Sequence, residues 1–217
     1  EKLSNYRWSK VSMIFQGAMN ALNPVLRVDE ILTEILRTHE RVTQSQATRR
    51  IKELFDLVGI AQDRMTSYAH ELSGGMRQRV VIAMSLLCNP SLIIADEPTT
   101  AFDVIVQDQI LGALERIQSE LGIGMMLITH DMAVIAETCD VVAVMYAGQI
   151  VEQATTERIF HHPAHPYTAA MLNSFPRVRG PKQHLVSLRG APPDLMDPPK
   201  RCAFAPRCPL VFEKCWG

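Results

Sequence analysis

The chain has 217 residues, of which 47% are hydrophobic and 21% charged, a composition typical of folded globular proteins that excludes wholesale disorder. Its 22 Lys and Arg residues nearly balance 23 Asp and Glu residues, for a net charge of −1. This balance argues against a nucleic-acid binder, which usually has a basic excess, and no apolar run approaches the roughly 18 residues of a membrane span.

The first half of the chain predicts one short strand and several amphipathic helices. Val11–Phe15 is an apolar run of strand length. Beyond it, apolar residues recur at helical spacing in three stretches that begin near Val28, Thr43 and Gly74. Thr43 with Gln46 also forms the pattern of a capping box, which predicts where the second of these helices starts.

The middle of the chain predicts buried strands. Leu92–Ala95, Met125–Thr129 and Val141–Met145 are short runs that are apolar throughout, with helical stretches between them. Strands of this kind alternating with helices indicate a parallel sheet that is covered on both faces. Ala147-Gly148 then predicts a turn into a short strand, Gln149–Glu152, that completes a hairpin.

The C-terminal segment has a different composition. Eight of the 13 prolines lie beyond Phe175, so a long helix or a central strand is excluded there. Cys202, Cys208 and Cys215 are three of the five cysteines, and an odd count with no signal-like segment favours reduced thiols in a cytoplasmic setting. Their spacing is compatible with an iron–sulfur cluster or zinc; the alternative is three free cysteines in a small packed tail.

Two carboxylates follow the strand at Leu92–Ala95. In open α/β sheets, ligands bind at the carboxyl ends of strands. Asp96 there is suited to holding Mg²⁺, which prefers oxygen ligands, and the adjacent Glu97 to polarising an attacking water. Taken alone, the pair also fits an ordinary acidic turn at a strand end.

A second polar motif opens the predicted third helix. Ser73, Gly74, Gly75 and Met76 offer a hydroxyl, free backbone N–H groups and a positive helix end, which are the parts of an anion site. The simpler interpretation is an N-cap serine followed by a glycine turn. The full stretch Leu72–Arg79, with Asp96 23 residues after Ser73, is far more specific than either piece.

This combination resembles the ATP-binding-cassette (ABC) transporter ATPases. Ser73–Met76 resembles the family's signature motif, and Ile93–Glu97 resembles the Walker B strand. Three further matches follow in the family's order: Gln16 resembles the Q-loop glutamine, Asp103 the D-loop aspartate and His130 the switch histidine.

The resemblance implies ATP and Mg²⁺ as cofactors and a role for each matching residue. Asp96 and Gln16 would hold Mg²⁺, Glu97 would orient or deprotonate water, and His130 would bind the γ-phosphate. In this family the ATP site is shared between two subunits. The signature residues, Ser73 to Met76, and the D-loop Asp103 would therefore contact nucleotide held by the partner.

The implied fold is an α/β P-loop NTPase (RecA-like) core with a parallel sheet, an inserted helical subdomain and a Pro/Cys-rich C-terminal extension. Residues 1–16 and 72–153 are assigned to a partial ATPase core, 17–71 to the helical subdomain, and 154–217 to the extension. Apolar side chains near Met19, Leu22 and Val25 are candidate contacts with a membrane permease.

One motif of the family is missing. No GxxxxGK[ST] sequence, the loop that cradles the phosphates, occurs in the 217 residues. The favoured interpretation is that the chain is an N-terminally truncated piece that is inactive and marginally stable alone. The alternative is a degenerate, non-catalytic subunit that only donates the signature motif to a partner.

The C-terminal third resembles one branch of the family. His165-Pro166-Tyr167-Thr168 and the cysteine segment look like the tail of dipeptide, oligopeptide and nickel importers, and in some members a fourth cysteine completes a 4Fe–4S site. The implied protein energises import from the cytoplasmic face of the membrane. Its partners would be a second ATPase subunit, identical or different, permease subunits and an extracytoplasmic substrate-binding protein, with no nucleic acid. A soluble ABC ATPase unrelated to transport is the remaining alternative.

Overall fold

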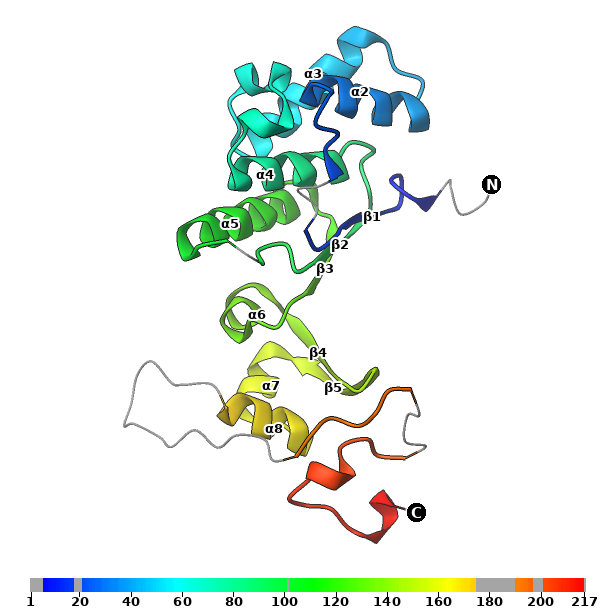
Figure 1. The fold of residues 1–217 in the computed structure, drawn as a ribbon, viewed down its shortest axis with the longest axis vertical. Helices are drawn as coiled ribbons and strands as arrows, with labels where there is room; N and C mark the ends of the chain where they lie inside the picture. The colour runs from blue at the N-terminus through cyan, green and yellow to red at the C-terminus, as the bar shows by residue number, and fades with distance from the viewer. Residues whose placement is uncertain (1–5, 18–20, 101, 175–189, 197–200, 217) are drawn as a thin grey trace. The chain divides into compact units, whose positions relative to one another are not determined.

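The computed structural model describes residues 6–17, 21–100, 102–174, 190–196 and 201–216. Its internal contacts divide the chain into two compact units, residues 1–130 and residues 131–217, which are described separately below (Figure 1). Within the described ranges, no helix is both long and apolar enough to cross a bilayer.

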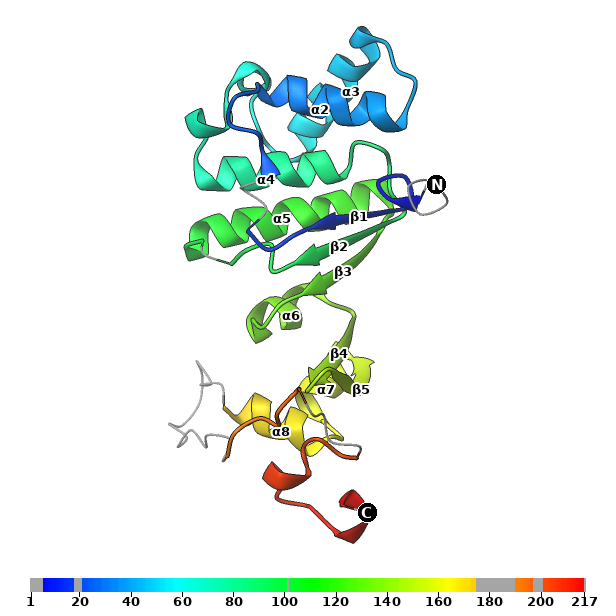
Figure 2. The ribbon, with the colours of Figure 1, turned by 45° about the vertical axis from the view of Figure 1, so that its right-hand side comes forward.

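The first unit is built on a three-stranded parallel sheet. Its strands are β1 (Val11–Ile14), β2 (Leu92–Asp96) and β3 (Gly124–Ile128). They run side by side in the order β1-β2-β3 (Figure 2), with Ile14 paired to Ala95 and Asp96 paired to Ile128. The predicted parallel pairing of Leu92–Ala95 with Met125–Thr129 is confirmed, and the sheet also includes β1, which the sequence predicted only as a short strand. Because parallel strands end at the same edge of a sheet, the residues that follow them become neighbours.

The described residues of this unit also form four helices and two short 3₁₀ turns. They are α2 (Val28–His39), α3 (Gln44–Leu57), η2 (Gln62–Thr66), η3 (Ala69–Glu71), α4 (Gly74–Ser85) and α5 (Val104–Leu121). The predicted capping box at Thr43 and Gln46 is present at the start of α3. The helix α4 packs against α3, α5 and β1, and a continuous core with Phe55, Ile82 and Ile93 fully buried joins helices to sheet.

The second unit contains a hairpin, three helices and two 3₁₀ turns in its described part. Its elements are α6 (Met132–Thr138), β4 (Val141–Tyr146), β5 (Gln149–Thr155), α7 (Thr156–His161), α8 (Pro166–Asn173), η4 (Ala205–Arg207) and η5 (Glu213–Cys215). The strands β4 and β5 pair antiparallel, and Ala147 and Gly148, both at positive φ, form the turn. The predicted hairpin is therefore confirmed.

The placement of Val141–Met145 in the parallel sheet is wrong for the described residues, in which β4 pairs with β5 in a separate two-stranded sheet. Along β4, Val142, Val144 and Tyr146 are buried, while Val141 and Met145 are exposed. One face of the strand is thus covered, as is usual in an antiparallel sheet. An apolar run alone does not reveal whether one face or both are buried.

The C-terminal cysteine segment is attached to the hairpin through an aromatic cluster. Phe204 is 1% exposed and contacts the rings of Tyr146 and Tyr167 edge-on. Arg207 lies over the Tyr146 ring and donates a hydrogen bond from Nη1 to its hydroxyl at 3.1 Å. Residues 131–153 thus belong to the same compact unit as the C-terminal segment. The assignment of these residues to an ATPase core stays a prediction.

Candidate functional site

Three of the predicted site residues meet at the carboxyl edge of the sheet. Gln16 follows β1, Glu97 follows β2 and His130 follows β3, so the central strand carries the carboxylate (Figure 2). Gln16 donates from Nε2 to Oε2 of Glu97 at 2.8 Å. Nδ1 of His130 lies 3.0 Å from Oε1 of the same carboxylate, and because an ionised carboxylate only accepts, His130 is the donor.

The backbone at Glu97 is unusual and firmly held. Its φ is +45°, a left-handed conformation that costs a side chain about 1–3 kcal/mol and is common at functional sites. The N–H of Glu97 donates to the carbonyl of Ile128 at 2.8 Å, which ties the turn after β2 to the end of β3. This turn directs the carboxylate toward the residues that follow the flanking strands.

A fourth residue joins the network. Thr100 donates from Oγ1 to Oε2 of Glu97 at 2.9 Å, a role for this hydroxyl that sequence reasoning missed. The signal that could have found it is the spacing, because a hydroxyl three residues after a strand-end carboxylate can reach that carboxylate across one turn. Hydrogen bonds from His130 and Thr100 lower the pKa of Glu97, so the carboxylate is ionised at neutral pH.

The signature and D-loop residues lie at the starts of two packed helices. Ser73 accepts from the N–H of Met76 at 3.3 Å and caps α4, which begins at Gly74. Asp103 accepts from the N–H groups of Ile105 and Val106, both at 3.0 Å, and caps α5. The N-cap interpretation of Ser73 is therefore confirmed; contact with a nucleotide stays a prediction.

Gly75 has a packing reason to be glycine. It is buried where α4 crosses α5, and a Cβ added there would lie 2.8 Å from Cγ1 of Val106. Real Cβ atoms essentially never approach a neighbour so closely. The two predicted nucleotide-contacting segments are thus held together by close helix packing.

The donor set beside Glu97 is chemically suited to Mg²⁺. Asp96 ends β2 with a partly buried carboxylate, and Gln16 adds an amide oxygen, because its nitrogen is the atom that faces Glu97. Oxygen donors of this kind are those that Mg²⁺ prefers. These two residues therefore fit the ion, although the described residues contain no group of three His, Cys, Asp or Glu side chains that could hold a metal.

The structure does not support the iron–sulfur or zinc site expected from the cysteine spacing. Cys202 is exposed, while Cys208 and Cys215 are half-buried, and all three lie within the described residues, where no metal-binding group forms. Cys208 caps η4 and packs on the Phe204 cluster, whereas Cys215 ends a separate turn, η5. Local packing thus accounts for Cys208 without a metal.

Comparisons with known proteins agree with these observations. Residues 3–100 match the family described as ABC transporter, and residues 151–215 match the oligopeptide/dipeptide transporter C-terminal region. The chain is 46% identical over 216 residues to the oligopeptide transport ATP-binding protein OppD of Haemophilus influenzae, covering 99% of this chain and 67% of the relative. The chain belongs to the ABC transporter ATPases, in their oligopeptide/dipeptide branch.

Other relatives give the same result. AppD of Bacillus subtilis, an oligopeptide transport ATP-binding protein, is 47% identical over 97% of this chain and 65% of its own length. OppD of Escherichia coli is 45% identical over 99% of this chain and 64% of its own length. The chain thus spans about two thirds of the length of these relatives.

Solved structures confirm the α/β P-loop NTPase fold of ABC ATPases. The cassette cbiO1 of Clostridium perfringens, part of the transporter complex cbiONQ, aligns with a TM-score of 0.64 at 27% identity, over 74% of this chain and 61% of that one. The dimeric bacterial ABC transporter cassette MJ0796 aligns with a TM-score of 0.62 at 27% identity, over 71% and 66% of the two chains.

Proposed function

We propose that this chain is the ATP-hydrolysing subunit of a membrane importer for oligopeptides or dipeptides. The observation that carries the proposal is the Glu97 carboxylate, held by Gln16 and His130 at the ends of three adjacent strands. Family membership supplies the transport context, and the relatives' names favour a peptide over nickel as cargo. The match of residues 151–215 to a transporter C-terminal region disfavours a soluble ABC ATPase unrelated to transport.

In the proposed reaction, Glu97 accepts the proton of the attacking water. Its hydrogen bonds keep it ionised, as a general base requires, and its side chain is partly exposed, so water can reach it. His130, with 78% of its side chain exposed, donates to the γ-phosphate. Asp96 and Gln16 hold Mg²⁺, which neutralises charge on the phosphates when bound.

A second cassette completes the site in this proposal. Ser73, Gly75 and Asp103 would contact ATP held by the phosphate-binding loop of a partner subunit. The similarity to a cassette whose structure is described as dimeric supports this arrangement. Because the 217 residues contain no GxxxxGK[ST] sequence, hydrolysis assays require the full-length protein with its partner cassette. A non-catalytic role is disfavoured because the strand-end residues form a connected network.

Permease contacts are proposed for the surface around α2, at the cytoplasmic face of the membrane. Of the apolar candidates, Val25 is 76% exposed and available, whereas Leu22 is 3% exposed and belongs to the core. Met19 lies outside the described residues. An extracytoplasmic binding protein would deliver the peptide to the permease.

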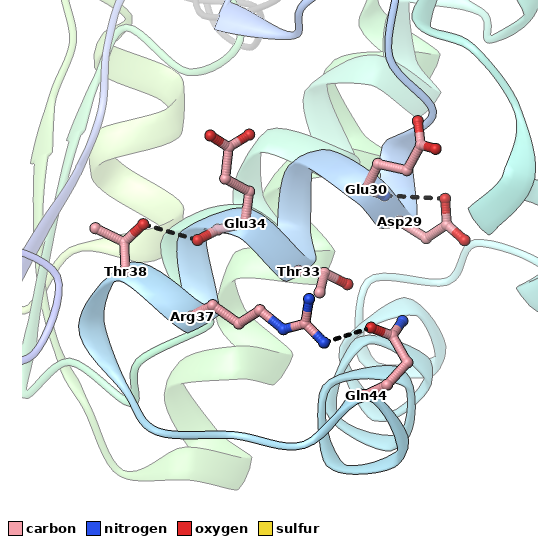
Figure 3. A pocket seen from close by; sticks show the side chains of 7 residues that line it. All are labelled: Asp29, Glu30, Thr33, Glu34, Arg37, Thr38 and Gln44. Atoms are coloured by element: carbon pink, nitrogen blue, oxygen red, sulfur yellow. Dashed lines mark hydrogen bonds between the residues drawn. The ribbon is translucent and has the colours of Figure 1, made fainter.

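A shallow cavity of about 430 Å³ lies on α2, only a few residues beyond Val25 (Figure 3). Its lining carries three carboxylates, Asp29, Glu30 and Glu34, against one cation, Arg37, which already donates to Gln44 at 2.8 Å. Within the described part of the chain, the Glu34 carboxylate has no side-chain partner. Thr33 also lines it although this side chain is only 7% exposed. Its chemistry suits a cationic side chain, which we propose belongs to the permease.

The decisive experiment replaces the proposed base in the full-length protein. Glu97→Gln keeps the shape of the side chain and removes the proton acceptor, so the rate of ATP hydrolysis should fall by at least ~10² while ATP binding persists. Glu115→Gln, at an exposed position on α5, is the matched control. A wild-type hydrolysis rate in Glu97→Gln would refute the proposed function.

A further inference from the structure

The carboxylate of Glu97 accepts hydrogen bonds from three donors and has few acceptor positions left. Oε2 accepts from both Gln16, at 2.8 Å, and Thr100, at 2.9 Å. Oε1 accepts from His130 at 3.0 Å. Because each carboxylate oxygen offers about two acceptor positions, Oε2 is saturated, and the remaining position for an attacking water is on Oε1.

The three donors differ in how they are attached to Glu97. Gln16 and His130 come from the ends of separate strands, and the proposed reaction gives each a second partner: the metal for the amide oxygen of Gln16, and the γ-phosphate for His130. Thr100 belongs to the same turn as Glu97. Its own N–H donates to the carbonyl of Glu97 at 3.2 Å, so backbone and side chain both fix it to this residue.

We infer that Thr100 is the positioning residue of the hydrolytic step. Resting on the proposed function, the inference is that the Thr100 hydroxyl stays on Oε2 while Gln16 and His130 also serve the metal and the γ-phosphate. With Oε2 held, the side chain cannot rotate freely about its terminal bond, and Oε1 remains directed at the water. Thr100 touches neither nucleotide nor water and acts through Glu97 alone.

The test compares Thr100→Val, which removes the hydroxyl at nearly constant size, with Thr100→Ser, which retains it. In the full-length protein with its partner cassette, Thr100→Val should lower kcat for ATP hydrolysis by roughly ten- to a hundredfold, as expected for losing a hydrogen bond to a charged group. KM and the equilibrium affinity for ATP should not change. Thr100→Ser should restore most of the rate.

Two controls separate positioning from a structural role. Thr66→Val removes an exposed hydroxyl that donates to a backbone carbonyl in η2, and it should leave kcat unchanged. In a Glu97→Gln background, Thr100→Val should cause no further loss, since a residue that acts through Glu97 has nothing left to position.

Several outcomes would overturn the inference. A wild-type kcat in Thr100→Val, a failure of Thr100→Ser to restore the rate, or an equal loss in the Glu97→Gln background would each do so. A silent Thr100→Val beside an inactive Glu97→Gln refutes the positioning role and leaves the proposed function intact. A fully active Glu97→Gln refutes the proposed function first.

Discussion

Gly75 offers a way to separate packing from nucleotide contact in the signature segment. A methyl group added there would lie 2.8 Å from Cγ1 of Val106, at least half an ångström inside ordinary van der Waals contact. Gly75→Ala must therefore push α4 away from α5 or force Val106 off its rotamer. Overpacking of this kind costs about 1–3 kcal/mol.

A double-mutant cycle isolates that cost. Alanine is intrinsically favoured over glycine in a helix by up to about 1 kcal/mol, so Gly75→Ala alone should destabilise the protein by ~0–2 kcal/mol. In a Val106→Ala background the clash is absent, and the same change should be neutral or stabilising. The coupling between the two sites should thus be ~1–3 kcal/mol.

The measurement is urea unfolding of the four full-length proteins, followed by the rate of ATP hydrolysis. If Gly75→Ala costs as much in the Val106→Ala background as in the wild type, the packing explanation is refuted. If the double variant regains stability and hydrolysis together, packing alone explains the glycine. If stability returns and hydrolysis does not, Gly75 also needs close access to nucleotide, as the resemblance implies.

Two further predictions concern other surfaces. Glu34→Lys reverses a charge in the α2 cavity and places it against the proposed cation, so co-purification of the permease should fall at least ~10-fold. Hydrolysis by the cassettes should be unchanged, and the control Glu120→Lys on α5 should change neither co-purification nor hydrolysis. Glu152 accepts from the N–H groups of Ala164 and His165 at 2.7 and 2.9 Å; burial raises its pKa, but its hydrogen bonds outweigh burial and leave the pKa lowered. Because the pKa is lower in the folded state, ionised Glu152 stabilises the second unit above pH ~4.3, and this stability is lost as pH falls through the folded value. Glu152→Gln should therefore flatten the acid end of a plot of the free energy of unfolding in urea against pH. An unchanged plot would contradict this.

Much of the candidate site followed from local sequence. Gln16, Glu97 and His130 each follow an apolar run of strand length, and such runs are visible in a single sequence. The caps at Thr43 and Ser73 were equally local, because a cap is set by a side chain and the next three N–H groups. These features needed no knowledge of distant contacts.

What local sequence patterns did not reveal depended on strand pairing, on the packing of side chains or on backbone conformation. The apolar run at Val141–Met145 looked like another strand of the parallel sheet, yet β4 pairs with the strand that follows it. The spacing of Cys202, Cys208 and Cys215 was compatible with either a metal site or a packed tail, because spacing does not determine where thiols lie. The described residues form no metal-binding group, and Cys208 packs on aromatic rings. Thr100 was overlooked because its role depends on the side-chain direction set by a positive φ at Glu97.

Strand order is what turns three separate motifs into one site. Periodicity predicts that β1, β2 and β3 exist, but any order of three parallel strands would satisfy it. Only with β2 in the centre can the residue that follows it be reached from both sides, since neighbouring strands lie about 4.8 Å apart and the outer two about twice that. With β2 at an edge, either Gln16 or His130 would be one strand too far to hydrogen-bond to Glu97. The simultaneous contacts of 2.8 and 3.0 Å are therefore a consequence of topology, and the central position of the strand is what allows one carboxylate to connect the glutamine and the histidine.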